Sequence, residues 1–286
     1  MDAAVLDSRQ RGYLKTIRTS GEMLLTVVSD ILDISKIEAG QLALRCKPFS
    51  LREAITQVGD SAWAFQTNFG YTQVQVEVVD ATMPECDWIV GDPVRVIQVL
   101  QNCLLNAIKF TKDEADGLVQ YGVRLRQAED NQRSFLEFHI ADSGIGIPEE
   151  NQSLIFEAFH QVHPSRDSHE LGGTGLGLTI SKRLVEMMGG EMWLDSNTTG
   201  PNRGTRVYFT IPYQPAEKDV SKQESAPHAS KLVSIADSTP PQYHHVIFTC
   251  GGTHETTTSR RRSKSTQETN AATIVSNSIS NQLHEK

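Results

Sequence analysis

The stretch that decides the fold is Asn102-Cys-Leu-Leu-Asn106-Ala-Ile-Lys109-Phe110, read together with two glycine-rich segments that follow it, Asp142-Ser-Gly144-Ile-Gly146-Ile-Pro148 and Gly172-Gly173-Thr174-Gly175-Leu176-Gly177-Leu178. Each segment alone is weak evidence, because a lone Gly-x-Gly is usually a turn and a pair of helical asparagines is usually solvated. In this order, however, they supply amide ligands, a carboxylate and bare backbone amides, which together suit a nucleotide. ATP is therefore the first ligand to consider.

The two asparagines, Asn102 and Asn106, are four residues apart, so their side chains share one helix face. An amide oxygen is a neutral, hard ligand that suits Mg²⁺, which takes its other ligands from water and phosphate oxygens. Lys109 follows on the same face and would meet phosphate charge. Without the other segments, the asparagine pair would more simply be a structural feature of the helix.

The two glycine-rich segments predict the base and phosphate contacts. Asp142 ends an expected strand, where a carboxylate can accept a hydrogen bond from the exocyclic amine of adenine; the bland alternative is an aspartate that caps a turn. Gly144 and Gly146 allow the backbone to approach the base and to adopt positive φ. Gly175 and Gly177 precede an expected helix, whose N-terminal amides can bind a triphosphate.

This arrangement resembles the catalytic and ATP-binding domain of sensor histidine kinases of the hybrid type, which belong to the GHKL ATPase superfamily. The three segments look like the N, G1 and G2 boxes, and the stretch 155–162 looks like the F box. The resemblance runs from about Tyr13 to Tyr213. Upstream, the stretch 30–40 resembles the end of the dimerisation hairpin of that family.

The resemblance implies an α+β fold, namely a two-layer α/β sandwich of the GHKL (Bergerat) ATPase type preceded by a helix from a dimerisation hairpin. We expect residues 1–45 to hold the second helix only of that hairpin, and residues 46–214 to form the catalytic domain. Residues 215–286 are rich in Ser, Thr, Gln and Asn and are predicted to be a disordered tail. The basic cluster 260–264 within it is more simply a solvated charge run than an import signal.

The resemblance also implies a set of site residues, with ATP and Mg²⁺ as cofactors. The expected catalytic residues are Asn102, Asn106 and Lys109, with Asn106 as the magnesium ligand. The nucleotide is expected to contact Asn106, Lys109, Phe110, Asp142, Gly144, Gly146, Gly173, Thr174, Gly175, Leu176 and Gly177. In gyrase-like and chaperone relatives a glutamate general base stands at the position of Asn102; because asparagine cannot accept a proton, we expect poor ATP hydrolysis.

An acceptor is missing from the pattern. None of the nine histidines has the His-Glu/Asp-x-x-Thr/Asn-Pro setting of the family's phosphorylated histidine. We therefore expect transfer of the ATP γ-phosphate to a histidine-containing hairpin of another kinase chain, with a response-regulator receiver domain as an indirect partner and a weak homodimer at most. The chain would be a fragment, a misplaced gene start or a truncated paralogue. The alternative function is a non-catalytic nucleotide-binding regulatory module.

Bulk properties narrow the setting. The chain has 286 residues and a net charge of −8, which argues against a nucleic-acid-binding module. Its four cysteines are scattered, so neither a zinc site nor a disulfide framework is indicated. No apolar run reaches the length of a membrane span, and we expect no membrane insertion by this chain and a cytoplasmic location.

Periodicity predicts the elements around these segments. Helices are expected over residues 13–38, 50–69, 93–110 and 175–188, and strands over 73–78, 117–127, 134–141, 191–196 and 204–211. Ser50 and Asp92-Pro93 are predicted helix starts, and Gly91 a turn. Residues 159–171 are expected to be a mobile lid, with Phe156 and Phe159 as its core anchors.

Overall fold

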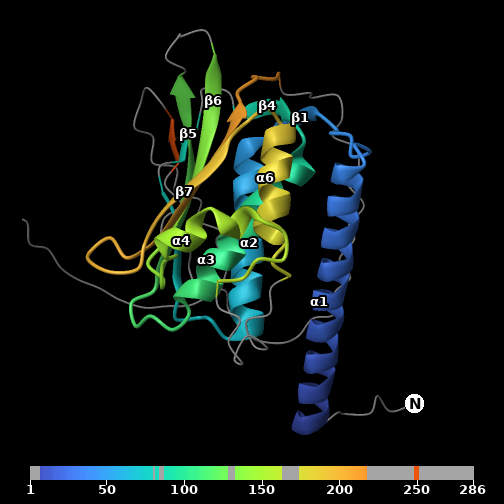
Figure 1. Ribbon diagram of the computed structural model, residues 1–286, viewed down its shortest axis with the longest axis vertical. Coiled ribbons are helices and arrows are strands. Elements are labelled where there is room, and N and C mark those ends of the chain that lie inside the picture. Colours follow the sequence, from blue (N-terminus) through green and yellow to red (C-terminus); the bar gives the residue numbers. More distant parts are fainter. Residues whose placement is uncertain are drawn as a thin grey trace, which may run out of the picture. The chain divides into compact units, whose positions relative to one another are not determined.

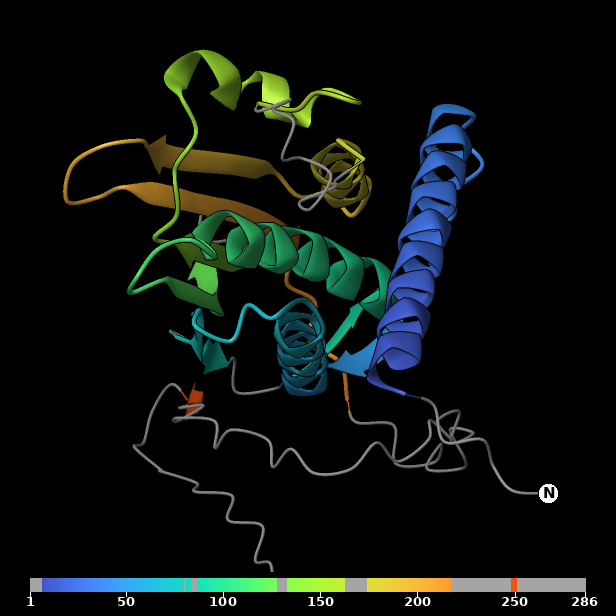
Figure 2. The same cartoon turned by 90° about the horizontal axis from the view of Figure 1, so that it is seen from below.

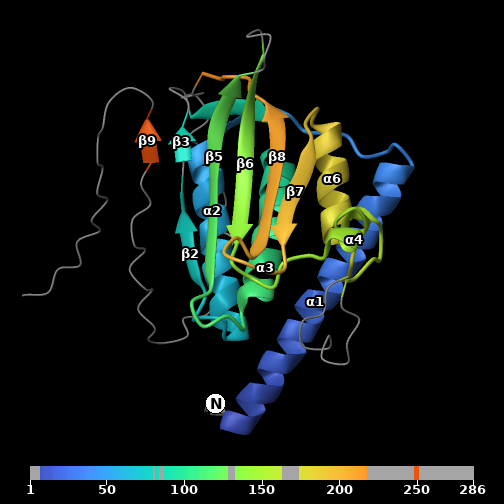
Figure 3. The ribbon, with the colours of Figure 1, turned by 60° about the vertical axis from the view of Figure 1, so that its left-hand side comes forward.

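A five-stranded sheet organises the computed structural model, which describes residues 7–79, 81–83, 87–127, 133–162, 174–217 and 248–250. The strand order is β2-β5-β6-β8-β7, and all neighbours are antiparallel except β2 and β5. The strands are β2 (Gln75–Val78), β5 (Leu118–Gln127), β6 (Ser134–Asp142), β7 (Met192–Asn197) and β8 (Gly204–Pro212). Figure 3 shows them side by side in this order.

Three helices cover one face of the sheet (Figures 1 and 3). They are α2 (Leu51–Phe69), α3 (Pro93–Thr111) and α6 (Gly177–Met187). Between the two layers lies one core of buried apolar side chains, in which the rings of Phe138 and Phe209 stack with centroids 4.6 Å apart. The predicted two-layer α/β sandwich is therefore confirmed.

Local chemistry sets the helix ends. The Ser50 hydroxyl accepts a hydrogen bond from the Glu53 amide and begins α2, and Gly70 ends it with φ +76°. Asp92 Oδ1 accepts from the amides of Val94 and Arg95 at the start of α3. These predicted boundaries are confirmed.

The short elements were not predicted. β1 (Lys47–Ser50) pairs antiparallel with β4 (Trp88–Gly91), so Gly91 ends a strand rather than forming the expected turn. β3 (Ala81–Met83) pairs parallel with β9 (Phe248–Cys250). Between β6 and α6 lie α4 (Glu149–Gln152) and the 3-10 helix η1 (Leu154–Phe156). Elements of three or four residues carry too few side chains for a periodic signal.

The far end of the chain is described only in part. The amide of Ala216 donates to the Trp88 carbonyl, so contacts with β4 continue just past the expected boundary at residue 214. Of the predicted disordered tail, the structure describes 215–217 and β9; the rest, including the basic cluster 260–264, lies outside the described residues. Within the described ranges, no helix has both the length and the apolar character that crossing a bilayer requires.

The first helix, α1 (Ser8–Glu38), lies beside α6 (Figure 2) and begins five residues before the prediction, because Asp7 and Gln10 form a capping box. In this helix acidic side chains are buried while large apolar side chains are exposed, the reverse of the usual pattern. Among the α1 residues whose burial is described, those under 9% exposed are Asp30 and Asp33, whereas Leu25 is 71% exposed. Two carboxylates, with the half-buried Ile34 and Ile37, therefore make the contact with the remaining domain.

Candidate nucleotide site

The predicted segments meet at one end of the helical layer. The first lies on the C-terminal half of α3, the second follows β6, and the third leads into α6. Asn102 Nδ2 donates to the Gly177 carbonyl and to Ser181 Oγ, both at 3.3 Å, which ties α3 to the first turns of α6. The amide of Ile145 donates to the Phe110 carbonyl at 3.3 Å, which ties the loop after β6 to α3. The structure thus brings all three segments together.

Asp142 lies at the end of β6, where its Oδ1 accepts hydrogen bonds from the amides of Gly144 (2.9 Å) and Thr205 (3.2 Å). Burial raises the pKa of this carboxyl to about 6, although the two amide hydrogen bonds oppose the rise. Both bonds end on Oδ1, so they hold the carboxylate in place and leave Oδ2 with no hydrogen-bond partner among the described residues. A carboxylate fixed in this way can accept a hydrogen bond from a ligand amine.

The backbone around the two glycines after Asp142 leaves no room for a side chain. A Cβ on Gly144 would lie 2.4 Å from the Phe110 carbonyl oxygen, and a Cβ on Gly146 would lie 2.1 Å from the Asn197 carbonyl oxygen. Gly146 also has φ +72°, which side chains rarely adopt. The sequence predicts that these glycines allow close approach by a base, whereas in the structure their close neighbours include backbone atoms of Phe110 and Asn197.

Asn106 and Lys109 share the half-buried face of α3. Burial lowers the pKa of Lys109 by removing water from its ammonium group, and no carboxylate within the described ranges forms an ion pair with it. The Asn106 amide likewise has no hydrogen-bond partner among those residues. A desolvated cation beside an open amide is a surface that favours an anionic ligand. Phe110, at the end of this segment, is 47% exposed.

The glycine segment before α6 is described from Thr174 onward, so Gly173 lies outside the described residues. Gly175 has φ +70°, and Leu176 is fully buried immediately before α6. The Thr174 hydroxyl accepts a hydrogen bond from the Leu176 amide at 3.1 Å and donates one to Asp30 Oδ2 at 3.0 Å. One amide of the expected phosphate cradle is therefore already bonded within the protein.

Two buried polar atoms near this segment were not expected from the sequence. Thr179 Oγ1 lies in the first turn of α6, and the other atom is Nε2 of His160, whose backbone carbonyl lies near Gly175. Neither atom has a hydrogen-bond partner among the described residues. Unpartnered buried atoms are uncommon, and a polar ligand is one way to satisfy them. No local sequence signal distinguishes these two residues.

The expected lid lies mainly outside the described residues, which stop at 162 and resume at 174. Of its two predicted core anchors, Phe156 is half-buried, with the Lys182 ammonium 4.8 Å from its ring centroid. The prediction for Phe159 is wrong, because its side chain is 69% exposed and its φ is +65°. Its amide donates a hydrogen bond to the Gly175 carbonyl at 3.1 Å.

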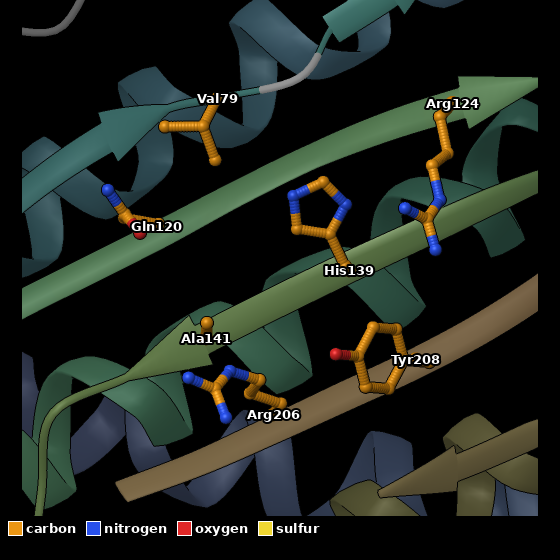
Figure 4. A pocket seen from close by; sticks show the side chains of 7 residues that line it. All are labelled: Val79, Gln120, Arg124, His139, Ala141, Arg206 and Tyr208. Carbon is orange, nitrogen blue, oxygen red and sulfur yellow. The ribbon is translucent and has the colours of Figure 1, made fainter. Parts of the chain in front are cut away.

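A separate hollow of about 200 Å³ lies on the opposite, helix-free face of the sheet (Figure 4). Its lining comprises Val79, Gln120, Arg124, His139, Ala141, Arg206 and Tyr208. None of the predicted site residues borders it, so it is distinct from the candidate nucleotide site.

Comparison with known proteins decides the family. Residues 91–215 match the family model described as histidine kinase-, DNA gyrase B- and HSP90-like ATPase. Residues 91–215 form a histidine kinase-type ATPase domain. The prediction of a GHKL histidine kinase catalytic domain is thereby confirmed, and the range includes every predicted site residue.

Curated relatives of this ATPase domain are themselves histidine kinases. The chain is 39% identical over 207 residues to the signal transduction histidine-protein kinase BarA of Escherichia coli K12, covering 72% of this chain and 21% of BarA. It is 38% identical over 220 residues to the circadian input-output histidine kinase CikA of Synechococcus elongatus, covering 77% and 27%. The chain therefore spans about a quarter or less of the length of these relatives.

Solved structures agree with the fold of the ATPase domain. The crystal structure of full-length ShkA in complex with AMPPNP is 28% identical, with a TM-score of 0.57, and the match covers 75% of this chain and 41% of that chain. The histidine kinase AdeS of Acinetobacter baumannii is 20% identical, with a TM-score of 0.50 over 74% of this chain and 87% of that chain. The second likeness concerns the fold alone.

Proposed function

We propose that this chain binds Mg²⁺-ATP through residues 102–177 and transfers the γ-phosphate to a histidine on another protein chain. The observation that carries the proposal is that hydrogen bonds from Asn102 to Gly177 and from Ile145 to Phe110 join the three segments, on a helix that also carries the desolvated Lys109. The complex of ShkA with AMPPNP, an ATP analogue, supports the nucleotide class. In this assignment residues 46–214 are the catalytic domain, and residues 1–45 are the second helix of a dimerisation hairpin.

Each part of the site has a role in this proposal. Asp142 accepts a hydrogen bond from the adenine amine, with Gly144 and Gly146 shaping the loop beneath the base. Lys109 and the backbone around Gly175 and Gly177 meet the phosphates at the start of α6. The remaining contacts are assigned to Phe110, Gly173, Thr174 and Leu176.

The metal fits the donors that are present. Asn106 would hold Mg²⁺ through its amide oxygen, which is free within the described ranges and is a hard donor suited to this ion. The described residues contain no cluster of three or more His, Cys, Asp or Glu side chains that could form an all-protein metal cage. A magnesium ion held mainly by phosphate oxygens and water fits such a site. When bound, it would neutralise phosphate charge.

The chemistry is phosphoryl transfer. An imidazole nitrogen of the acceptor forms a bond to the γ-phosphorus while the bond to the β–γ bridging oxygen breaks and ADP leaves. Positioning and charge neutralisation by Lys109 and the backbone amides provide the catalysis. Asn102 cannot act as a general base, and its amide group donates to Gly177 and Ser181. Water is therefore a poor acceptor, and the γ-phosphate is retained for a histidine.

The proposed partners follow from the residues that this chain provides. The acceptor histidine comes from the hairpin of another kinase chain, and a receiver domain takes the phosphoryl group afterwards. The free thiols Cys46 and Cys103 and the requirement for ATP fit a cytoplasmic setting.

Titration calorimetry with Mg²⁺-AMPPNP tests the nucleotide part of the proposal. We expect saturable binding to the wild-type chain and at least a tenfold loss of affinity in Asp142→Ala, because a hydrogen bond to a charged group is removed. Asp195→Ala, a change of the same kind on β7, is the matched control and should bind normally. Equal affinity of wild type and Asp142→Ala would refute the site assignment.

A further inference from the structure

The contact between α1 and the nucleotide segment places a negative charge beside a proposed phosphate site. Asp30 Oδ2 accepts a hydrogen bond from the Thr174 hydroxyl at 3.0 Å, although 144 positions separate the two residues. Asp30 is 8% exposed. Its carboxylate is therefore held close to the segment that leads into α6, with little water to screen it.

The neighbouring carboxylate of α1 is different, because it is compensated. Asp33 Oδ2 accepts hydrogen bonds from Arg95 Nη1 at 2.9 Å and from Gln98 Nε2 at 3.0 Å, both on α3. Within the described residues, Asp30 has no such basic partner. Burial raises the pKa of Asp30, and the nearby charge of Asp33 adds to the rise, which the hydrogen bond from Thr174 opposes. Asp30 is thus the uncompensated charge of the pair.

The same contact occupies a donor of the phosphate segment. Thr174 Oγ1 donates to Asp30 and accepts from the Leu176 amide at 3.1 Å, so the carboxylate, the hydroxyl and the amide form one chain of hydrogen bonds. That amide points to a side chain of its own segment instead of a ligand. An incoming triphosphate would meet a fixed anion and one donor fewer.

On this basis we propose that Asp30 sets the nucleotide affinity of the site: docking of α1 through Asp30 disfavours ATP, and ATP binding releases α1. The inference rests on the proposed function of the site. Coupling of this kind is reciprocal, so nucleotide weakens the docking of α1 by the same factor by which docking weakens nucleotide binding. The contact is suited to release, because the desolvation cost of burying a carboxylate cancels much of the energy gained from its hydrogen bonds. Little net stability is therefore lost when the contact opens.

Asp30→Asn in the full chain tests the proposal, since it removes the charge and keeps the size and the acceptor oxygen. We expect Mg²⁺-AMPPNP to bind about fivefold or more tightly than to wild type, within the usual range of coupling between two sites. Glu38→Gln is the matched control, because it removes the same charge from an exposed position of α1 and should change affinity less than twofold. Unchanged or weaker binding to Asp30→Asn would overturn the proposal, and so would an equal gain in Glu38→Gln.

Hydrogen exchange on the wild-type chain gives a second test that needs no substitution. Mg²⁺-AMPPNP should speed the exchange of amides 26–34 of α1, whereas unchanged or slower exchange would contradict the release of this helix. The two hypotheses can fail separately. If neither wild type nor Asp30→Asn binds AMPPNP, the nucleotide site itself is wrong. If both bind equally well, the site stands and the role of Asp30 is wrong.

Discussion

Helices α1 and α3 both carry a long apolar stripe, which is buried in α3 and largely exposed in α1. In α3 the side chains of Val96, Val99 and Leu100 are fully buried against the sheet and its neighbouring helices. In α1 the side chains of Leu24 and Leu25 are 64% and 71% exposed. Exposed apolar side chains that gather on one face can mark an interaction site. The apolar face of α3 is covered within the domain, whereas α1 leaves Leu24 and Leu25 exposed.

The difference also concerns how each helix is held. α3 is held by close packing of buried apolar side chains in the core. α1 is held by Asp30, Asp33 and two half-buried isoleucines, so much of its contact is polar. Polar contacts that bury charge contribute little net stability, and they can be exchanged for water or for another partner. Apolar packing therefore dominates the contacts of α3, and buried polar groups contribute much of the contact of α1.

The largest expected effect is on stability, and it tests this contrast directly. Leu100→Ala in α3 removes a fully buried side chain and should lower the free energy of unfolding by about 2–5 kcal/mol. Leu25→Ala in α1 makes the same chemical change at an exposed position and should stay within about 0.5 kcal/mol of wild type. Urea denaturation measures both. Similar losses in the two variants would show that α1 is packed as firmly as α3.

Glycine substitutions extend the contrast to the backbone. Gly146→Ala should destabilise the chain by about 2 kcal/mol or more, because φ +72° is strained for alanine and the new Cβ would clash with the Asn197 carbonyl. Gly21 lies in open space on α1. Gly21→Ala should therefore stabilise α1 locally by about 0.5–1 kcal/mol. Circular dichroism melts report both changes. A stable Gly146→Ala variant would mean that the loop after β6 is looser than described.

Nucleotide affinity should depend on pH through Asp142. With a pKa of about 6, this carboxylate is ionised at pH 7.5 and largely protonated at pH 5, where it accepts a hydrogen bond less well. Wild type should therefore bind Mg²⁺-AMPPNP about tenfold more tightly than Asp142→Asn at pH 7.5, and the advantage should shrink as the pH falls through 6. The comparison with Asp142→Asn cancels the titration of the nucleotide itself. A constant ratio from pH 7.5 to pH 5 would contradict this role.

The smallest effect concerns self-association through α1. A bundle built from one hairpin helix per chain buries less apolar surface than one built from two, so we expect weak and concentration-dependent dimers. Sedimentation velocity over a range of concentrations measures this, and Leu25→Glu, which places a charge on the exposed stripe, should shift the equilibrium towards monomer. A tight dimer unaffected by Leu25→Glu would place the interface elsewhere.

Sequence reasoning succeeded where the signal is local. The caps at Ser50 and Asp92 depend on residues within one helical turn, and each of the three motif segments is recognised from its own short sequence. The capping box of Asp7 and Gln10 is equally local and was overlooked, which is why α1 begins earlier than predicted.

Prediction from the sequence failed where residues far apart in the chain determine the local structure. The contact of Asp30 with Thr174 leaves no trace in either neighbourhood, because a periodic pattern identifies a helix face and not its partner. The exposure of Phe159 could not be predicted from its apolar character, because its backbone is bonded to Gly175, 16 residues later, while its side chain stays outside the core. The close approach of Gly144 to the Phe110 carbonyl likewise could not be predicted without the fold.

The most direct test of the account is phosphoryl transfer in trans. The chain is incubated with γ-labelled ATP and Mg²⁺, with and without a separate hairpin that carries the acceptor histidine of a hybrid histidine kinase. We predict acid-labile label on the hairpin, none on this chain alone, and no transfer by Asn106→Asp. Because no covalent link raises the effective concentration, the hairpin should be needed at roughly micromolar to millimolar concentration. Normal ATP binding with no label on any hairpin, or acid-labile label on this chain itself, would contradict the account.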